Sequence, residues 1–164
     1  MFIAIVVAVM ILTWKFADWR NWQRYQATML FFVVGNLFYY FVYHDHFLWK
    51  FIPDTFNHHV TEIIYSFTVY PLTVLMFLSG MPVTLKKKIF HIASYIAVFT
   101  SAELILHLIG RMVYEYGWNY GLSVAWNCMM FPLLAIHHKK PLIAYGVCFV
   151  LIFVMNWLFP FYLA

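Results

Sequence analysis

Long apolar stretches alternate with short polar ones along most of the chain. A helix that crosses a bilayer needs about 20 residues, within a range of about 17–25. The first run reaches that length only when Trp14, Lys15 and Phe16 are included. The apolar runs cover about residues 1–14, 27–43, 60–83, 89–110, 117–136 and 141–160. This pattern predicts an all-α polytopic membrane helix bundle with about six transmembrane helices, or five if the first does not span.

The polar connections between the runs are short, which favours antiparallel packing of consecutive helices. No linker or low-complexity segment divides the chain, so residues 1–164 are expected to form a single transmembrane helical domain. Pro71 and Pro132 lie inside the third and fifth runs and are expected to kink those helices. Each proline leaves a backbone carbonyl without its helical partner, which neighbouring helices or side chains must satisfy.

Composition excludes a soluble globular protein. Hydrophobic residues make up 65% of the chain and charged residues 10%, whereas soluble domains are usually about half apolar and about a quarter charged. A chain of this length has no interior large enough to bury so much apolar surface. The excess is therefore expected to face lipid.

The basic residues are divided unevenly between the two sides of the predicted bundle. One side carries only Lys50 and Arg111, whereas the other carries Lys15, Arg20, Arg24, Lys86, Lys87, Lys88, Lys139 and Lys140. Because cytoplasmic loops are enriched in Lys and Arg, the asymmetry predicts cytoplasmic connections at 15–26, 84–88 and 137–140, with both termini outside. All eight except Lys15 are expected to contact anionic lipid headgroups rather than nucleic acid.

Seven histidine and acidic residues lie close together in the connection after the second run and at the start of the third: His44, Asp45, His46, Asp54, His58, His59 and Glu62. Imidazole nitrogens are good ligands for zinc and copper. His44, His46, His58 and His59 therefore form a candidate site for a divalent metal. The spacing matches no standard zinc signature, and the alternatives are a solvated loop containing histidines or a pH-sensing cluster.

Glu103 and His107 lie four residues apart in the fourth run, so they share one helix face. Ionisable groups at membrane depth are costly and are functional candidates for that reason. Asn36 and Asn127 are expected at the depth of Glu103, and with Glu62 and His107 they are expected to line one ligand-binding cavity open to the outside. The alternative is structural, with a protonated Glu103 donating to a neighbouring helix and the asparagines joining helices.

Motifs in both halves of the chain form a recognisable set: Trp19-Arg20-Asn21-Trp22, Thr28 through Phe32, Gly35-Asn36-Leu37, Leu48-Trp49, Tyr70 through Leu75, Gly117-Trp118-Asn119, Met130-Phe131-Pro132 and His137 through Leu142. This set resembles a family of small multi-pass membrane proteins found in endospore-forming Gram-positive bacteria of the Bacilli and Clostridia. The resemblance covers most of the chain and implies a bacterial plasma membrane or a spore membrane. It implies no activity, so no residue role is taken from it.

The favoured function is a non-enzymatic membrane protein that binds or conducts an ion or a small polar ligand through the outward-facing cavity. One alternative is a membrane-embedded metalloenzyme that acts on lipid, with its metal on the four histidines. Another is an accessory subunit that packs against another membrane protein, or a homo-oligomer. The chain has no Walker loop and no Gly-x-Ser-x-Gly elbow, so ATP hydrolysis and an α/β-hydrolase have no support.

Overall fold

The computed structural model describes residues 1–52 and 56–160. Over these residues the chain is mostly helical, as the apolar pattern predicts, with a 3-10 helix η1 (Trp19–Arg24) between α1 and α2. Two short strands that this pattern does not predict, β1 (Trp49–Phe51) and β2 (Met112–Tyr114), lie in connections between helices. The seven α-helices are α1 (Phe2–Phe16), α2 (Gln26–Val42), α3 (His58–Phe67), α4 (Val69–Ser79), α5 (Leu85–Leu108), α6 (Tyr120–Lys139) and α7 (Pro141–Leu158).

Three helical segments of the described chain are long and apolar enough to cross a membrane. They are His58–Ser79 with 22 residues, Leu85–Leu108 with 24 and Pro141–Leu158 with 18. Helices α1 and α2 are apolar but shorter, and α6 has a polar last turn of His and Lys. The helices of a membrane protein are therefore present, while the expected number of about six spans is not confirmed.

The first of these segments is divided into α3 and α4 at Thr68, where φ is −122° and ψ is −70°. Pro71 follows three residues later and has no N–H to donate to the carbonyl of Phe67. The Thr68 hydroxyl turns back and donates to the carbonyl of Ile64. The interruption expected in this run is therefore present, whereas Pro132 lies inside α6 without dividing it.

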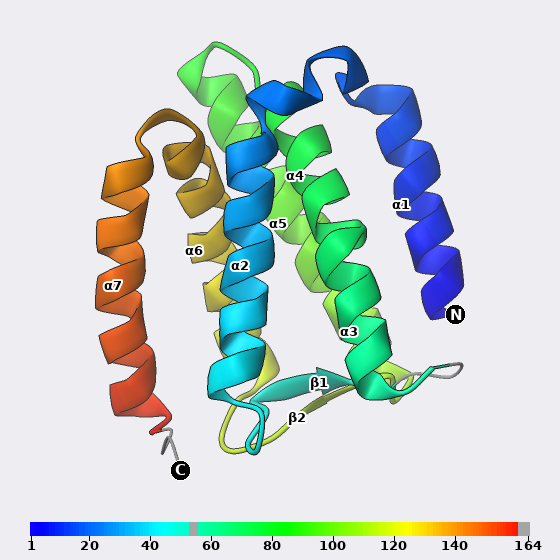
Figure 1. Ribbon diagram of the computed structural model, residues 1–164, viewed down its shortest axis with the longest axis vertical. Coiled ribbons are helices and arrows are strands. Elements are labelled where there is room, and N and C mark those ends of the chain that lie inside the picture. The colour runs from blue at the N-terminus through cyan, green and yellow to red at the C-terminus, as the bar shows by residue number, and fades with distance from the viewer. Residues whose placement is uncertain (53–55, 161–164) are drawn as a thin grey trace.

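Helix α4 forms the centre of the bundle (Figure 1). It packs against α1, α2 and α6, and Val74, Leu75 and Phe77 on it are completely buried. Phe131 of α6 is also completely buried and meets the ring of Phe77 edge-on, with 5.2 Å between ring centroids. This aromatic contact joins the two helices near the middle of the molecule.

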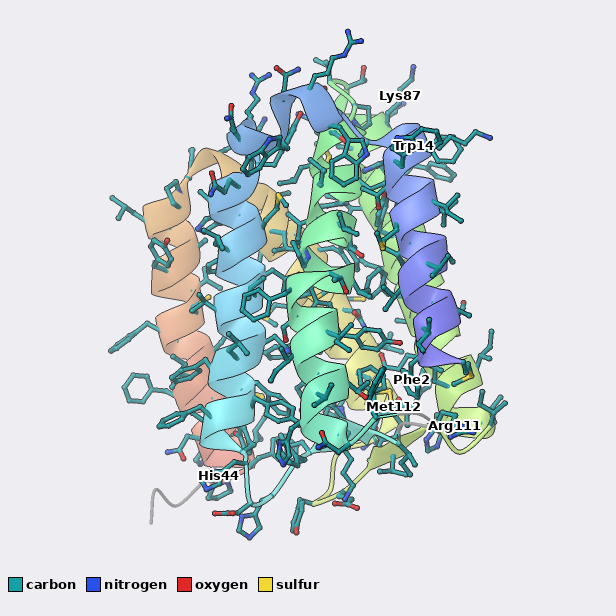
Figure 2. The ribbon with its side chains drawn as sticks, turned by 45° about the vertical axis from the view of Figure 1, so that its right-hand side comes forward. Phe2, Trp14, His44, Lys87, Arg111 and Met112 are labelled. Carbon is teal, nitrogen blue, oxygen red and sulfur yellow. The ribbon has the colours of Figure 1, made fainter. Side chains whose placement is uncertain are left out.

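The two ends of the bundle differ in charge. In Figure 1 the start of α1 and the end of α7 lie toward the end that carries β1 and β2, here called the sheet end. The connections from α1 to α2, α4 to α5 and α6 to α7 lie at the opposite end, here called the basic end. Figure 2 shows Lys87 at the basic end and Arg111 at the sheet end. The eight clustered basic residues belong to the three connections of the basic end or to the helix turns beside them.

Helices α5 and α7 are largely uncovered, with only 6% of the residues in their most apolar windows buried. Leu142 and Trp157 of α7 are 82% and 81% exposed. Water would make so extensive an apolar surface unstable in a monomer. This surface fits a lipid environment, in agreement with the composition.

Candidate functional site

Glu103 of α5 is held by side chains from two other elements. The Tyr114 hydroxyl of β2 donates to Glu103 Oε1 at 2.9 Å, and the Asn127 amide of α6 donates to Oε2 at 3.1 Å. Both carboxylate oxygens therefore act as acceptors, an arrangement that an ionised carboxylate satisfies without a proton of its own. The structural alternative, in which Glu103 donates a hydrogen bond to a neighbouring helix, is not the arrangement of these two contacts, in which Glu103 accepts.

The partners of Glu103 are themselves fixed in position. Asn127 also donates to the backbone carbonyl of Ser123, one turn earlier in α6, at 3.0 Å. The Ser123 hydroxyl accepts a hydrogen bond from Trp118 Nε1 at 2.8 Å. A continuous chain of contacts thus connects Glu103, through α6, to an indole ring at the sheet end.

Tyr114 reaches Glu103 because the small sheet places it there. Strand β2 pairs antiparallel with β1, and Tyr114 lies opposite Trp49. An ion pair of 2.8 Å between Lys50 and Glu115 lies beside this register. Burial and the neighbouring Glu103 raise the pKa of Tyr114 above its usual value, so its hydroxyl keeps its proton and remains a donor.

Glycine permits the tight turn that leads into β2. Gly110 has φ of +70°, in the left-handed region that favours glycine. There α5 ends with a backbone hydrogen bond from Arg111 N–H to the carbonyl of Leu106. The strand can then fold back toward the final turns of α5, which include Glu103.

Glu103 and Asn127 line a cavity of about 740 Å³ inside the bundle. Asn36 of α2 and Tyr70 of α4 also line it, and most other lining residues are apolar or aromatic. The cavity extends between α1 and α5, with α4 and α6 behind it and residues of both strands at the sheet end. The volume falls in the range of small-molecule sites in proteins, about 300–1,000 Å³.

The cavity opens on the flank of the bundle between α1 and α5. Val98 and Ile105 of α5 line the cavity, yet they are 65% and 58% exposed. Leu12 of α1, on the opposite wall, is 46% exposed. These three apolar side chains form an opening that faces the side of the molecule rather than one of its ends.

Glu62 lies in a second polar group next to the cavity. It is 6% exposed on α3 and is a hydrogen-bonding neighbour of the Asn36 amide. The same amide donates to the Ser66 hydroxyl at 2.9 Å. Tyr70 is within electrostatic range of both Glu62 and Glu103. Of the residues expected to share a cavity, Asn36, Asn127 and Glu103 line it, whereas Glu62 and His107 are not among the lining residues.

His107 does not form the expected contact with Glu103. Its Nδ1 atom lies 3.0 Å from the carbonyl oxygen of Met112, and its ring packs against Tyr114 with 4.6 Å between centroids. The chain turns back after α5, which brings the Met112 carbonyl within reach of the His107 ring. Glu103 is hydrogen-bonded to Tyr114 and Asn127 instead. His107 therefore supports the strand that positions Tyr114 rather than the cavity wall.

The outer histidines are not arranged as a metal centre. His44 pairs with Asp45 at 2.9 Å, and His46 packs against Tyr116. Within the described ranges, no three His, Cys, Asp or Glu side chains are placed to hold a metal ion. The proposed zinc or copper site on His44, His46, His58 and His59 is therefore unsupported, and Asp54 lies outside the described residues.

The ring of His58 is surrounded by other aromatic rings. Its ring lies against Phe47 and Tyr40, with centroid distances of 5.1 and 5.3 Å. The His59 ring centroid is 5.7 Å away, and His44 and His46 belong to the turn that follows α2.

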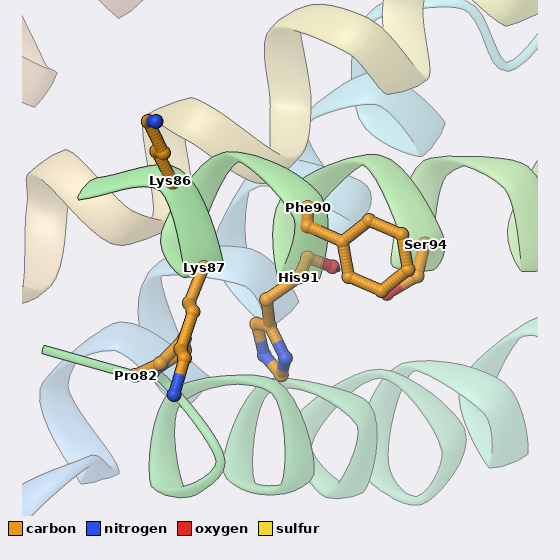
Figure 3. A pocket seen from close by; sticks show the side chains of 6 residues that line it. All are labelled: Pro82, Lys86, Lys87, Phe90, His91 and Ser94. Atoms are coloured by element: carbon orange, nitrogen blue, oxygen red, sulfur yellow. Dashed lines mark hydrogen bonds between the residues drawn. The ribbon is translucent and has the colours of Figure 1, made fainter. Parts of the chain in front are cut away.

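A smaller hollow of about 430 Å³ lies at the basic end (Figure 3). Lys86, Lys87 and Phe90 of α5 line it. His91 also borders it, and its Nε2 atom lies 2.9 Å from the carbonyl oxygen of Phe77 at the end of α4. The two lysines at a membrane-facing edge suit contact with an anionic headgroup.

Sequence patterns did not identify several residues of the site. Trp49 and Trp118 fit an interfacial aromatic belt, and Tyr114 lies outside every helical run. The only local signal is the spacing of Ser123 and Asn127, which are four residues apart and therefore share one face of a helix. Tyr114 offers no such signal because its partner comes from another element.

Comparison with known proteins does not place the chain in a group. A scan against protein-family models, a search of curated proteins and a search of solved structures each found no match. The functional argument therefore depends on the geometry of the site.

Proposed function

We propose that this chain is an integral membrane protein that takes a small ligand into the bundle at Glu103. The observation that carries the proposal is a carboxylate, anchored on both oxygens, that lines a cavity of about 740 Å³. A carboxyl group at membrane depth is costly. A purely structural carboxyl would be enclosed by its partners, whereas Glu103 also borders open space.

The distribution of charge supports an orientation with the basic end in the cytoplasm and both termini outside. Glu103 lies near the sheet end of α5, so this orientation places it in the outer part of the membrane. The lysines and arginines of the basic end would then face the anionic headgroups of the inner leaflet. The resemblance noted above makes a bacterial plasma membrane or a spore membrane the proposed location.

Cysteine labelling tests this orientation. In a chain with Cys128 and Cys148 replaced by alanine, His46→Cys should react with an impermeant maleimide in intact cells, because exposed His46 lies at the sheet end. The matched variant Gln23→Cys, exposed at the basic end, should react only after permeabilisation. The reverse labelling pattern would overturn the orientation.

Filling the cavity tests ligand binding. Ala102 lines the cavity and is exposed to it, so Ala102→Phe should reduce bound ligand about tenfold, since overpacking a fitted site costs about 1–3 kcal/mol. Native mass spectrometry of protein released from membrane-derived nanodiscs would show the ligand as an added mass on the wild-type chain.

Ala97→Phe is the matched control, because Ala97 is an exposed alanine of α5 and does not belong to the cavity lining. This variant should keep the added mass at the wild-type level. Two results would argue against the proposed function. One is a wild-type spectrum that shows no added ligand mass, and the other is the same amount of added mass in Ala102→Phe and Ala97→Phe.

A further inference from the structure

Three tryptophans line the cavity that contains Glu103: Trp49 of β1, Trp118 of the connection between β2 and α6, and Trp126 of α6. Their rings form one cluster, with centroid distances of 4.7 Å from Trp49 to Trp118 and 6.0 Å from Trp49 to Trp126. Trp118 and Trp126 are 6.4 Å apart. A simple interfacial belt would direct such rings toward lipid, whereas this cluster lies on the wall of an internal space.

The tryptophan cluster and the carboxylate belong to the same connected framework. Trp126 directly precedes Asn127, the residue that donates to Glu103. Trp118 is joined to the same turn of α6 through the Ser123 hydroxyl. Glu103 and the three indoles thus line one cavity, and neighbouring residues of the chain hold them. One face of Trp49 is stacked on Tyr39 at 3.9 Å, so the other face and the remaining two indoles are the aromatic surfaces left for a ligand.

This combination selects one class of ligand. An ammonium group is attracted by the negative face of an aromatic ring, and indole is the best of the aromatic side chains for this purpose. A bare metal ion would require several oxygen or nitrogen ligands at once, and no such group of His, Cys, Asp or Glu occurs in the part of the chain that the structure describes. An alkylated ammonium ion needs only a negative counter-charge and a lining of aromatic and apolar side chains.

The rest of the cavity fits an apolar tail. Val9 and Leu12 of α1 face it from one side, and Val98 and Ile105 of α5 from the other. The exposed positions of Val98 and Ile105 place the opening toward the lipid-facing flank. A ligand that is dissolved in the bilayer can reach Glu103 by this route without crossing the polar ends.

We propose that the cavity binds a lipophilic organic ammonium ion, with its cationic head between Glu103 and the tryptophan cluster and its hydrocarbon part in the opening between α1 and α5. This inference rests on the proposed function and names the ligand class of the same site. It gives Glu103 the role of counter-ion to the ligand, with its two oxygens held in place by Tyr114 and Asn127.

The test uses two amphiphiles of equal chain length, dodecyltrimethylammonium and the neutral dodecyldimethylphosphine oxide. Binding of the radiolabelled compounds is measured by equilibrium dialysis on protein in nanodiscs, with empty nanodiscs as background. Wild-type protein should bind the cation about tenfold more tightly than the neutral compound, as expected for a desolvated cation–π site with a counter-charge. Glu103→Gln should remove this preference while leaving binding of the neutral compound unchanged.

Two matched variants separate the site from general effects. Glu115→Gln removes a carboxylate that pairs with Lys50 outside the cavity, and Trp157→Leu removes an exposed indole from α7. Both should retain the preference for the cation, whereas Trp126→Leu should weaken it several-fold.

Equal affinity of wild-type protein for the two amphiphiles would overturn the ammonium assignment, as would a preference that survives Glu103→Gln. Absence of saturable binding of both would overturn it as well. None of these results contradicts the proposed function, which has a separate test. That test compares the ligand mass bound to wild-type protein and to Ala102→Phe, and it uses neither amphiphile.

Discussion

Glu103→Ala is expected to lower the free energy of unfolding by roughly 1–3 kcal/mol, because one buried and one half-buried donor lose their acceptor. These donors are the Tyr114 hydroxyl and the Asn127 amide. Glu103→Gln retains the shape and one acceptor oxygen, so its loss should be smaller. The same glutamine variant should nevertheless lose most of the small-molecule mass retained by the wild-type protein, since it lacks the charge.

Thermal and denaturant unfolding in detergent, together with native mass spectrometry, would separate these effects. Stability near wild type combined with lost ligand identifies Glu103 as a binding residue. If Glu103→Gln retains both the stability and the bound ligand of the wild-type protein, Glu103 has only a structural role between elements. The proposal that Glu103 binds the ligand would then be wrong. Glu115→Gln is the control for removal of a carboxylate at the surface.

Phe131→Ala is expected to produce the largest loss of stability, roughly 3–5 kcal/mol, by analogy with phenylalanine truncations in protein cores. Phe131 is completely buried. Its ring touches Phe77 of α4 and Phe99 of α5 at centroid distances of 5.2 and 5.0 Å. Truncation would leave a void where three helices meet, and no neighbouring segment is free to fill it.

Phe41→Ala provides the matched control, because Phe41 is 70% exposed on the outer face of α2. Its truncation in lipid nanodiscs should change the unfolding free energy by less than about 1 kcal/mol. The exposed ring contacts lipid in both the folded and the unfolded state, so its removal affects the two states similarly. Similar losses for the two variants would show that Phe131 is not part of the packed centre.

Helix boundaries follow closely from the apolar pattern in the C-terminal part of the chain. The run at 89–110 became α5 (Leu85–Leu108), and the run at 141–160 became α7 (Pro141–Leu158). Pro71 marked the interruption of the third run, because a missing N–H is a local property that the sequence displays directly. The two strands were not predicted, since three-residue pairings between segments about 60 residues apart leave little local signal.

The candidate site was only partly accessible from the sequence. Glu103 was identified from its position in an apolar run, and Asn36 and Asn127 from their expected depth. His107 was assigned to Glu103 by spacing, but the turn after α5 offered it the Met112 carbonyl instead. The outer histidines were grouped by proximity along the chain, but among the described residues no three His, Cys, Asp or Glu side chains are placed to hold a metal ion.

The sequence by itself determined the membrane character, the helical class and the difference in charge between the two ends, because each depends on residue types summed over a segment. Only the tertiary structure decided that Tyr114 and Asn127 meet at Glu103, that three tryptophans share a cavity with it, and that this cavity opens between α1 and α5. Periodicity defines one face of a helix, but which partner that face meets depends on helix rotation and on the fit of side chains from distant segments.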